Sequence, residues 1–246
     1  MIIRENVRYT GEHPRQIMDV YAPEGKARAA FLYFHGGGLT RGDKSLYGIW
    51  AEHLTERGIA FIAANYRLYP DAKYPDFILD AASAVACALK LAKELGTDKL
   101  YVGGSSAGGY LSMMLCFDTH YLKDAGVDPL SIAGYLHDAG QPTAHFQVLE
   151  CRGVDPRRVI VDESAPLYFI GMEEKYPPMR FIVSDNDMKN RLEQTMLVLS
   201  TMTHFGYENF DHIVMHGTHC HYTHREYEGE NSMKEMIASF IAQTEK

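Results

Sequence analysis

The chain has 246 residues, of which 46% are hydrophobic and 23% are charged, and its formal net charge is −8. This length allows one large domain or two small ones, with a sizeable buried core. Because no linker rich in Pro, Gly or Ser divides the chain, we predict one domain over residues 1–246. The acidic balance argues against a nucleic-acid-binding protein, which needs a basic surface for phosphate groups.

No apolar run approaches the ~20 residues of a membrane-spanning helix, so we expect no membrane association. The first residues, MIIRENVRYT, lack the apolar segment of a secretory signal. The four cysteines are widely spaced and form no C-x-x-C motif, which favours free thiols over a disulfide framework. We therefore expect a cytoplasmic protein.

Short apolar runs alternate with longer amphipathic stretches along the chain. Residues 7–9 and 16–21 predict a short antiparallel pair of strands. Buried strands are then predicted at residues 29–34, 59–64, 100–102, 132–136, 180–183 and 212–215. Helices are predicted at residues 76–95, 110–121, 189–205 and 230–242. This alternation predicts an α/β fold with a mostly parallel central sheet and helices on both faces.

The segment from about residue 137 to residue 166 departs from this alternation. It contains three prolines, scattered charges and one short apolar run. A connection of this length inside a compact domain is usually functional. We therefore predict a small lid-like insertion over the functional site.

A glycine-rich turn carries the strongest chemical signal. Residues 103–109 read GGSSAGG and lie between a predicted strand and a predicted helix. They contain the motif G-x-S-x-G, with Ser106 at its centre. Such a turn presents the serine hydroxyl at a helix N-terminus, where backbone N–H groups favour developing negative charge. Ser106 is the candidate nucleophile, and a glycine-rich turn without chemistry is the alternative.

A second glycine motif, HGGG at residues 35–38, directly follows the predicted strand at residues 29–34. Glycines at the end of a buried strand let backbone N–H groups approach a ligand closely. The N–H groups of Gly37 and Gly38 would form one half of an oxyanion hole, and the N–H group of Ala107 would form the other half.

These motifs, the stretch NYRLYP at residues 65–70 and Asp80 on the following helix resemble the α/β-hydrolases, and among them the hormone-sensitive-lipase-like esterases. The resemblance implies an eight-stranded type of sheet and a catalytic triad in the order Ser, Asp, His. It also implies hydrolysis of carboxylic esters without a cofactor, and it makes a homodimer plausible. We expect Asp80 to pair with Arg67 beneath the site.

Two features differ from the pattern of that family. Leu39 follows the HGGG motif, where the family commonly has an aromatic residue. Only 28 residues precede the first central strand, so we expect the N-terminal cap of the larger members to be almost absent. These differences argue against long-chain lipid substrates and favour the small-molecule esters of the acetyl- and feruloyl-esterase-like branch.

A nucleophilic serine needs a base within hydrogen-bond reach and an acid that orients the base. The acid should follow a later strand, and residues 184–187, SDND, follow the predicted strand at residues 180–183. The related family places its acid three positions after a small residue at the strand end. This spacing selects Asp187 and leaves Asp185 as the alternative, while simple helix capping would explain both carboxylates without catalysis.

Histidines crowd the segment after the last predicted strand, at positions 216, 219, 221 and 224. The family pattern, a histidine shortly after a glycine and before an aromatic residue, is nearly met by His219 and by His221. We take His219 as the base and keep His221 as the alternative. The other two histidines are expected at the surface or at a helix start. No metal site is predicted, because no second cluster of ligands lies at a characteristic spacing.

These residues predict a serine carboxylesterase that acts through an acyl-enzyme. Further residues are expected to line the substrate pocket; they are His35, Leu39, His137, Asp138 and His221. Triad chemistry does not separate esters from amides, so an arylformamidase-like or aminoacyl-peptidase-like hydrolase is one alternative. A ligand-binding receptor on a hydrolase fold is the alternative outside enzymes.

Overall fold

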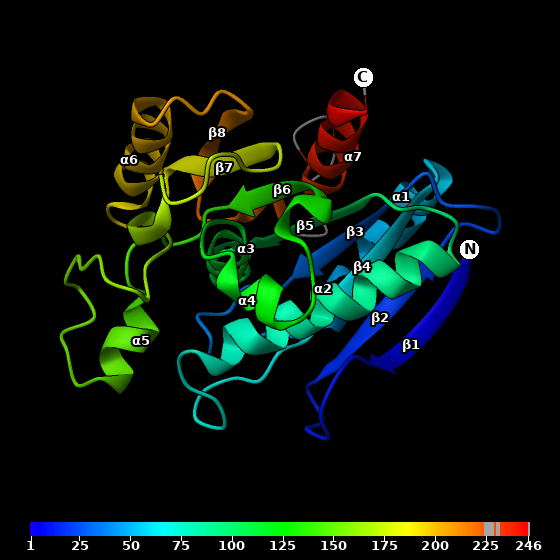
Figure 1. Ribbon diagram of the computed structural model, residues 1–246, viewed down its shortest axis with the longest axis horizontal. Coiled ribbons are helices and arrows are strands. Elements are labelled where there is room, and N and C mark those ends of the chain that lie inside the picture. Colours follow the sequence, from blue (N-terminus) through cyan, green and yellow to red (C-terminus); the bar gives the residue numbers. More distant parts are fainter. Residues whose placement is uncertain (224–228, 230–231, 246) are drawn as a thin grey trace.

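Eight strands form one sheet in the order β1-β2-β4-β3-β5-β6-β7-β8 in the computed structural model (Figure 1). The structure describes residues 1–223, 229 and 232–245. Strand β2 pairs antiparallel with β1 and with β4, whereas β4, β3, β5, β6, β7 and β8 run parallel. The predicted fold class, a mostly parallel sheet between helices, is confirmed.

The strands are β1 (Ile2–Arg8), β2 (Ile17–Ala22), β3 (Ala29–Phe34), β4 (Ile59–Ala64), β5 (Leu100–Ser105), β6 (Ile132–Asp138), β7 (Met179–Asn186) and β8 (Phe210–Thr218). The α-helices are α1 (Ala51–Glu56), α2 (Asp76–Glu94), α3 (Ala107–Phe117), α4 (His120–Asp124), α5 (Phe146–Cys151), α6 (Arg191–His204) and α7 (Met233–Thr244). Short 3₁₀ helices are η1 (Lys44–Trp50), η2 (Pro129–Ser131), η3 (Pro166–Phe169) and η4 (His221–Thr223). Among the described residues, no helix has both the length and the apolar character to cross a bilayer.

Several predicted boundaries differ from the structure, and three of these differences lie near the glycine turn or at the C-terminal helix. Strand β5 continues through Gly103 and Gly104 to Ser105, because these residues pair with β3 on one side and β6 on the other. The helix predicted at residues 110–121 begins earlier and is split into α3 and α4. The start of the helix predicted from residue 230 lies outside the described residues, and α7 begins at Met233.

The two faces of the sheet bury different layers of side chains. In β3, Leu32 and Phe34 pack in the core that includes α2, α3 and α6, whereas Phe31 and Tyr33 pack in the core that includes α1 and α7 (Figure 1). Successive side chains of a strand point to opposite faces, so a strand covered on both faces is apolar throughout. This explains why the continuous apolar runs predicted strands correctly.

The expected pair beneath the HGGG loop is present. Arg67 donates from Nη2 and Nε to the carboxylate of Asp80, with distances of 2.9 Å to Oδ1 and 2.9 Å to Oδ2. The Asp80 side chain is 2% exposed and also accepts a hydrogen bond of 2.8 Å from Gln16. The pair therefore joins α2 to the NYRLYP stretch.

The chain leaves the sheet after β6 and returns to it at β7, and the part around α5 projects from the body of the molecule (Figure 1). Backbone hydrogen bonds from Ala144 to Ile160 and from Leu167 to Pro142 hold this connection together. Arg191 of α6 donates to the carbonyl oxygen of Ala139 at its start. A lid-like role for this insertion stays a prediction.

Candidate active site

Ser106 lies at a sharp turn between β5 and α3. Its backbone has φ 56° and ψ −113°, a conformation that is strained for a residue with a Cβ. The turn is held because the Ser106 N–H donates to the carbonyl oxygen of Asp138 at 2.8 Å and the Tyr110 N–H donates to the Ser106 carbonyl at 2.9 Å. Strain of this kind persists only where the surrounding structure enforces it.

The glycines around Ser106 permit this turn because backbones approach closely there. A Cβ at Gly108 would lie 2.0 Å from the carbonyl oxygen of Phe34, and one at Gly104 would lie 2.6 Å from it. A Cβ at Gly36 would lie 3.1 Å from the carbonyl oxygen of Ser105. The two glycine motifs therefore pack directly against each other.

The three residues predicted as a triad lie in line. Ser106 Oγ is 2.9 Å from His219 Nε2, and His219 Nδ1 is 2.5 Å from Asp187 Oδ1. An ionised carboxylate only accepts hydrogen bonds, so Nδ1 carries the proton and Nε2 is left to accept the serine hydroxyl. The observed end of β7 and the loop after β8 thus bring an acid and an imidazole to the serine.

The surroundings of Asp187 favour its ionised form. Burial alone would raise its pKa, but the hydrogen bond and charge of His219, together with the N–H groups of Met188 and Ser184, hold the pKa below its usual value. These two N–H groups lie 2.6 Å and 3.3 Å from the carboxylate oxygens. A fixed anion is what the imidazole needs if it is to accept a proton.

The alternative acid and base lie elsewhere. The carboxylate of Asp185 accepts from the Gly217 N–H at 2.9 Å and lies 2.6 Å from Nδ1 of His216, whose side chain is 97% exposed. The ring of His221 lies against Gly217, with Nδ1 2.8 Å from the carbonyl oxygen of Thr218. His224 lies outside the described residues.

The backbone N–H groups predicted for an oxyanion hole are available. Gly37 has φ 118° and Gly38 has φ 64°, values that glycine adopts readily. Within the described part of the chain, no hydrogen bond uses the N–H groups of Gly37, Gly38 or Ala107. Unsatisfied N–H groups beside a serine can stabilise an anionic oxygen.

Ser106 opens into a cleft of about 600 Å³. The wall combines the HGGG loop, the serine turn, α5 and the loops after β7 and β8; its residues are Gly36, Gly37, Gly38, Thr40, Arg41, Gly42, Leu46, Tyr47, Ser105, Ser106, Phe146, Met188, His219, Cys220 and Thr223. Phe146 lies in the predicted insertion, and Met188 directly follows the predicted acid, Asp187. No sequence motif marked either of them as a cleft residue.

None of the five expected pocket residues is among those that line this cleft, and two of them support the HGGG loop instead. His35 is fully buried and accepts from Arg15 at 3.0 Å through Nε2 while Nδ1 donates to the Gly36 carbonyl at 2.7 Å. Burial lowers its pKa to about 4, so the ring is neutral. Leu39 is fully buried in the core, because the turn points its side chain inward.

His137 and Asp138 lie at the end of β6, beneath the cleft. His137 is 2% exposed, and its Nδ1 lies 2.9 Å from Ser112 Oγ. Burial lowers its pKa to about 3. Asp138 is fully buried, because β6 is an inner strand. These residues were expected in the pocket because they follow a strand, but β6 extends to include them.

Asp138 joins the serine turn to the histidine loop. Its carboxylate accepts from Ser105, the residue before the candidate nucleophile, and from the hydroxyl of Tyr222. Tyr33 in turn donates to Ser105 Oγ at 2.6 Å. Burial raises the pKa of Asp138 to about 6, although both hydrogen bonds oppose the shift. The sequence motifs gave no signal for this network, which depends on contacts between β3, β5, β6 and η4.

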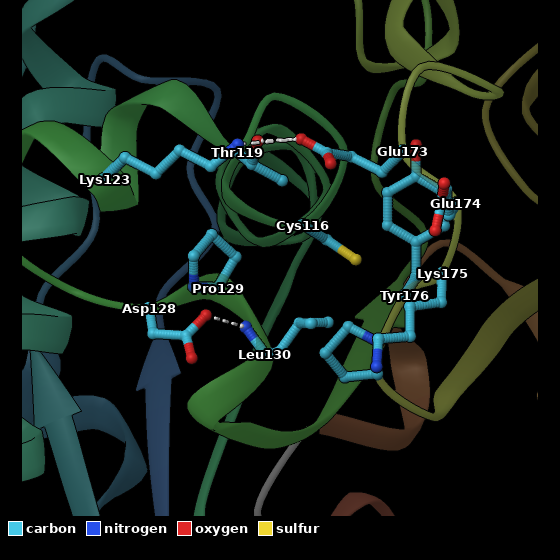
Figure 2. Close-up of a pocket in the computed structure, with 11 residues that line it drawn as sticks. Cys116, Thr119, Lys123, Asp128, Pro129, Leu130, Glu173, Glu174, Lys175 and Tyr176 are labelled. Carbon is cyan, nitrogen blue, oxygen red and sulfur yellow. Dashed lines mark hydrogen bonds and ion pairs between the residues drawn. The ribbon is translucent and has the colours of Figure 1, made fainter.

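A second pocket, of about 240 Å³, lies at the opposite edge of the sheet (Figure 2). Its lining residues in η2 and at Pro177 precede β6 and β7, so the pocket lies at the amino ends of these strands. Ser106 and Asp187 follow β5 and β7, so they lie at the carboxyl ends. Glu173 accepts from Thr119 and from Lys123, with 3.0 Å to the latter. No group of three or more His, Cys, Asp or Glu that could hold a metal ion occurs within residues 1–223, 229 and 232–245.

The eight-stranded sheet and the strained serine turn define an α/β-hydrolase. A model of the BD-FAE family matches residues 18–219. The chain therefore belongs to the BD-FAE family of α/β-hydrolases, as its motifs indicated.

Individual relatives support the same assignment. Esterase LipI of Mycobacterium tuberculosis is 30% identical over 111 residues, which are 44% of this chain and 34% of LipI. The chain thus spans about a third of the length of that relative. Esterase B from Lactobacillus Rhamnosis (HN001) superimposes with a TM-score of 0.79 at 18% identity, over 99% of this chain and 86% of that one. The butyrate-bound thermophilic esterase from Thermogutta terrifontis has a TM-score of 0.74 at 20% identity, over 92% and 89%.

Proposed function

We propose that this protein is a serine carboxylesterase that hydrolyses small carboxylic esters through an acyl-enzyme. The observation that carries the proposal is the line from Ser106 through His219 to Asp187 at a strained turn. Such a line activates a serine hydroxyl that is otherwise a weak nucleophile. The names of the relatives, esterase LipI and esterase B among them, favour esters over amides.

The proposed reaction begins when Ser106 Oγ attacks the ester carbonyl carbon and its proton passes to His219 Nε2. The carbonyl oxygen becomes an oxyanion that accepts from the N–H groups of Gly37, Gly38 and Ala107. The intermediate then collapses to the acyl-serine, and the leaving alcohol takes the proton from His219. Water attacks the acyl group with His219 as base, which releases the acid and restores the serine. Asp187 stays ionised throughout and holds the imidazole.

Covalent labelling tests the nucleophile. A fluorophosphonate probe should add to Ser106 with loss of fluoride, and mass spectrometry of the digested protein should find the label on that peptide. The Ser106→Ala variant should resist labelling and lose about 10⁴-fold or more in kcat on p-nitrophenyl acetate. Undiminished ester hydrolysis in that variant would overturn the proposal.

A substrate panel separates the alternatives. We expect p-nitrophenyl esters of short acids to give higher kcat/KM values than formyl amides or dipeptides. Faster turnover of the formyl amides or the dipeptides would favour the arylformamidase-like or aminoacyl-peptidase-like hydrolase. Absence of both labelling and turnover would favour a receptor on this fold.

The cysteines bear on the proposed compartment. Cys87, Cys116, Cys151 and Cys220 are all free thiols. Free thiols suit a reducing environment, so the proposed compartment is the cytoplasm. Oxidation of the purified protein with a mild disulfide-forming reagent, followed by thiol counting, should leave the buried Cys116 unreacted.

A further inference from the structure

A hollow of about 330 Å³ opens beside the serine cleft, and Phe146 and Met188 line both. One wall comes from the insertion after β6, through Gln141, Phe146 and residues 156–159. The other wall comes from residues 188–191 and Gln194, where the loop that carries Asp187 enters α6. Phe146 and Met188 therefore lie between the serine cleft and this hollow.

The hollow is cationic, although the chain as a whole carries a formal net charge of −8. Arg157 is bound to Asp155 through two nitrogens, with 2.9 Å and 2.6 Å to its carboxylate oxygens. Arg158, Lys189 and Arg191 form no ion pair within the part of the chain that the structure describes. Three cationic side chains thus line one hollow, and none of them is held in an ion pair by a described residue.

Arg191 is the unusual member of this group, because it is 5% exposed. Its guanidinium donates to the carbonyl oxygen of Ala139 and lies 3.5 Å from Gln141 Oε1, and both of these partners are neutral. Burial lowers its pKa, while attraction to Asp187 opposes the shift. Arginine stays charged in proteins, and a buried charge that is not held in an ion pair is costly. Asp187 and Asp138 attract the guanidinium, but their carboxylates are bound to His219 and to Ser105 and Tyr222. An anion in the hollow would be a direct partner for Arg191.

The backbone adds to this preference. Helix α6 begins at Arg191 beside the hollow and has 14 residues, and the N-terminus of a helix carries partial positive charge. Val159 and Phe146 in one wall and Met188 in the other supply apolar surface. The hollow therefore offers apolar contact toward the serine and cationic contact beyond it.

We infer that this hollow binds a carboxylate that the substrate carries a few bonds away from the ester bond that is cleaved. The inference rests on the proposed esterase function. The substrate class is then an ester with a free acid group, which is either a half-ester of a dicarboxylic acid or an acyl ester of a hydroxy acid. Apolar carbons between the two groups lie along Phe146 and Met188, and the carboxylate meets Arg158, Lys189 and Arg191.

Matched substrates test the charge preference in the native protein. The p-nitrophenyl half-esters of glutaric and adipic acid are compared with the neutral p-nitrophenyl esters of pentanoic and hexanoic acid. Acetyl esters of hydroxy acids are compared with the acetyl esters of the corresponding hydroxy amides, which tests the alcohol side. We expect the ratio of kcat/KM for anionic over neutral substrate to exceed ten in one of the two series. The ratio should fall as salt is raised from 0.05 M to 0.5 M, because salt screens the attraction.

Charge-removing variants test the residues. The double variant Arg158→Gln, Lys189→Gln lies on the exposed rim and should lower this ratio about tenfold, and Arg191→Gln should lower it further than Arg191→Lys. The matched control is Lys123→Gln, Lys175→Gln at the opposite pocket (Figure 2), which should leave the ratio unchanged. If Arg191→Gln fails to fold, the double variant Arg158→Gln, Lys189→Gln, which we call the rim variant, tests the carboxylate site by itself.

Two failures are distinguishable. A ratio of one or less in the native protein, or the same ratio in the rim variant, overturns the carboxylate site while Ser106-dependent hydrolysis of neutral esters upholds the esterase. Absence of Ser106-dependent hydrolysis on every ester overturns both.

Discussion

The two edges of the sheet carry pockets of opposite character. At the carboxyl ends of the strands, Ser106 is held in strained backbone and meets an imidazole and an ionised carboxylate. At the amino ends, the pocket of Figure 2 contains the ion pair between Glu173 and Lys123. A hollow alone therefore does not indicate a reactive site, whereas strain combined with unsatisfied N–H groups does.

The difference follows from chain direction. In a parallel sheet with helical connections, each strand ends where a loop and then a helix N-terminus begin. Such N-termini offer free N–H groups and partial positive charge. Helix C-termini, such as the end of α3 near Cys116, offer carbonyl oxygens instead. Chemistry that develops negative charge is thus favoured at one edge only.

Among the changes that test this comparison, the largest effect is expected at the proposed acid, on the edge that carries Ser106. Asp187→Asn should lower kcat on p-nitrophenyl acetate by about 10³–10⁴-fold, because an amide no longer holds the required tautomer of His219. The matched control is Asp185→Asn, which removes an exposed carboxylate bound to His216 and should change kcat less than about threefold. Steady-state kinetics of the two variants measure the contrast, and a larger loss in the control would reverse the assignment of the acid.

The next effect concerns the close packing beneath the serine. Gly108→Ala places a Cβ 2.0 Å from the Phe34 carbonyl oxygen, so the turn must shift. We expect a loss of about 100-fold in kcat/KM and a destabilisation of about 1–3 kcal/mol. In the control Gly25→Ala, nothing lies within 4 Å of the added carbon. Thermal unfolding and kinetics that match in the two variants would contradict this account of the turn.

A smaller effect separates the buried network from the triad. The pKa of Asp138 is raised to about 6 in the folded protein, against about 3.9 in an unfolded chain. Between about pH 4 and pH 6 the folded state therefore holds more protons, so the unfolding free energy falls as the pH rises, by at most about 1.4 kcal/mol per pH unit. Asp138→Asn does not titrate and should lack this fall.

Urea unfolding of both proteins across that pH range measures the difference, and the titrating groups that do not interact with Asp138 cancel in it. A difference between the two curves that is constant with pH would show that Asp138 does not titrate in the folded protein.

The smallest effect is expected at the opposite edge. Lys123→Gln removes an ion pair whose side chains are 56% and 35% exposed. Exposed pairs contribute little, so the unfolding free energy should change by less than about 1 kcal/mol, and kcat should stay the same. A substantial loss of activity in this variant would show that the amino-end pocket also affects turnover, which contradicts the comparison.

Much of the fold was predictable because its signals are local. The apolar runs of β3 and β4 predicted the ends of these strands correctly, since both of their faces are buried. The end of β5 was wrong, because Gly103 and Gly104 favour turns by themselves and are extended only through pairing with neighbours on both sides. Burial of His35 and His137 was also missed, because neither lies in a pattern that distinguishes a pocket from a core.

The amino-acid order by itself determined the sheet-and-helix alternation, the glycine turn at Ser106 and a short set of acid and histidine candidates. These features depend on side-chain size and polarity within a few positions. Only the tertiary structure decided that Asp187 and His219 meet, whereas Asp185 turns to His216. The choice depends on the irregular pairing of β7 with β8 between Ser184 and Asn186 and on the end of β7 at Asn186, which contacts between distant segments decide.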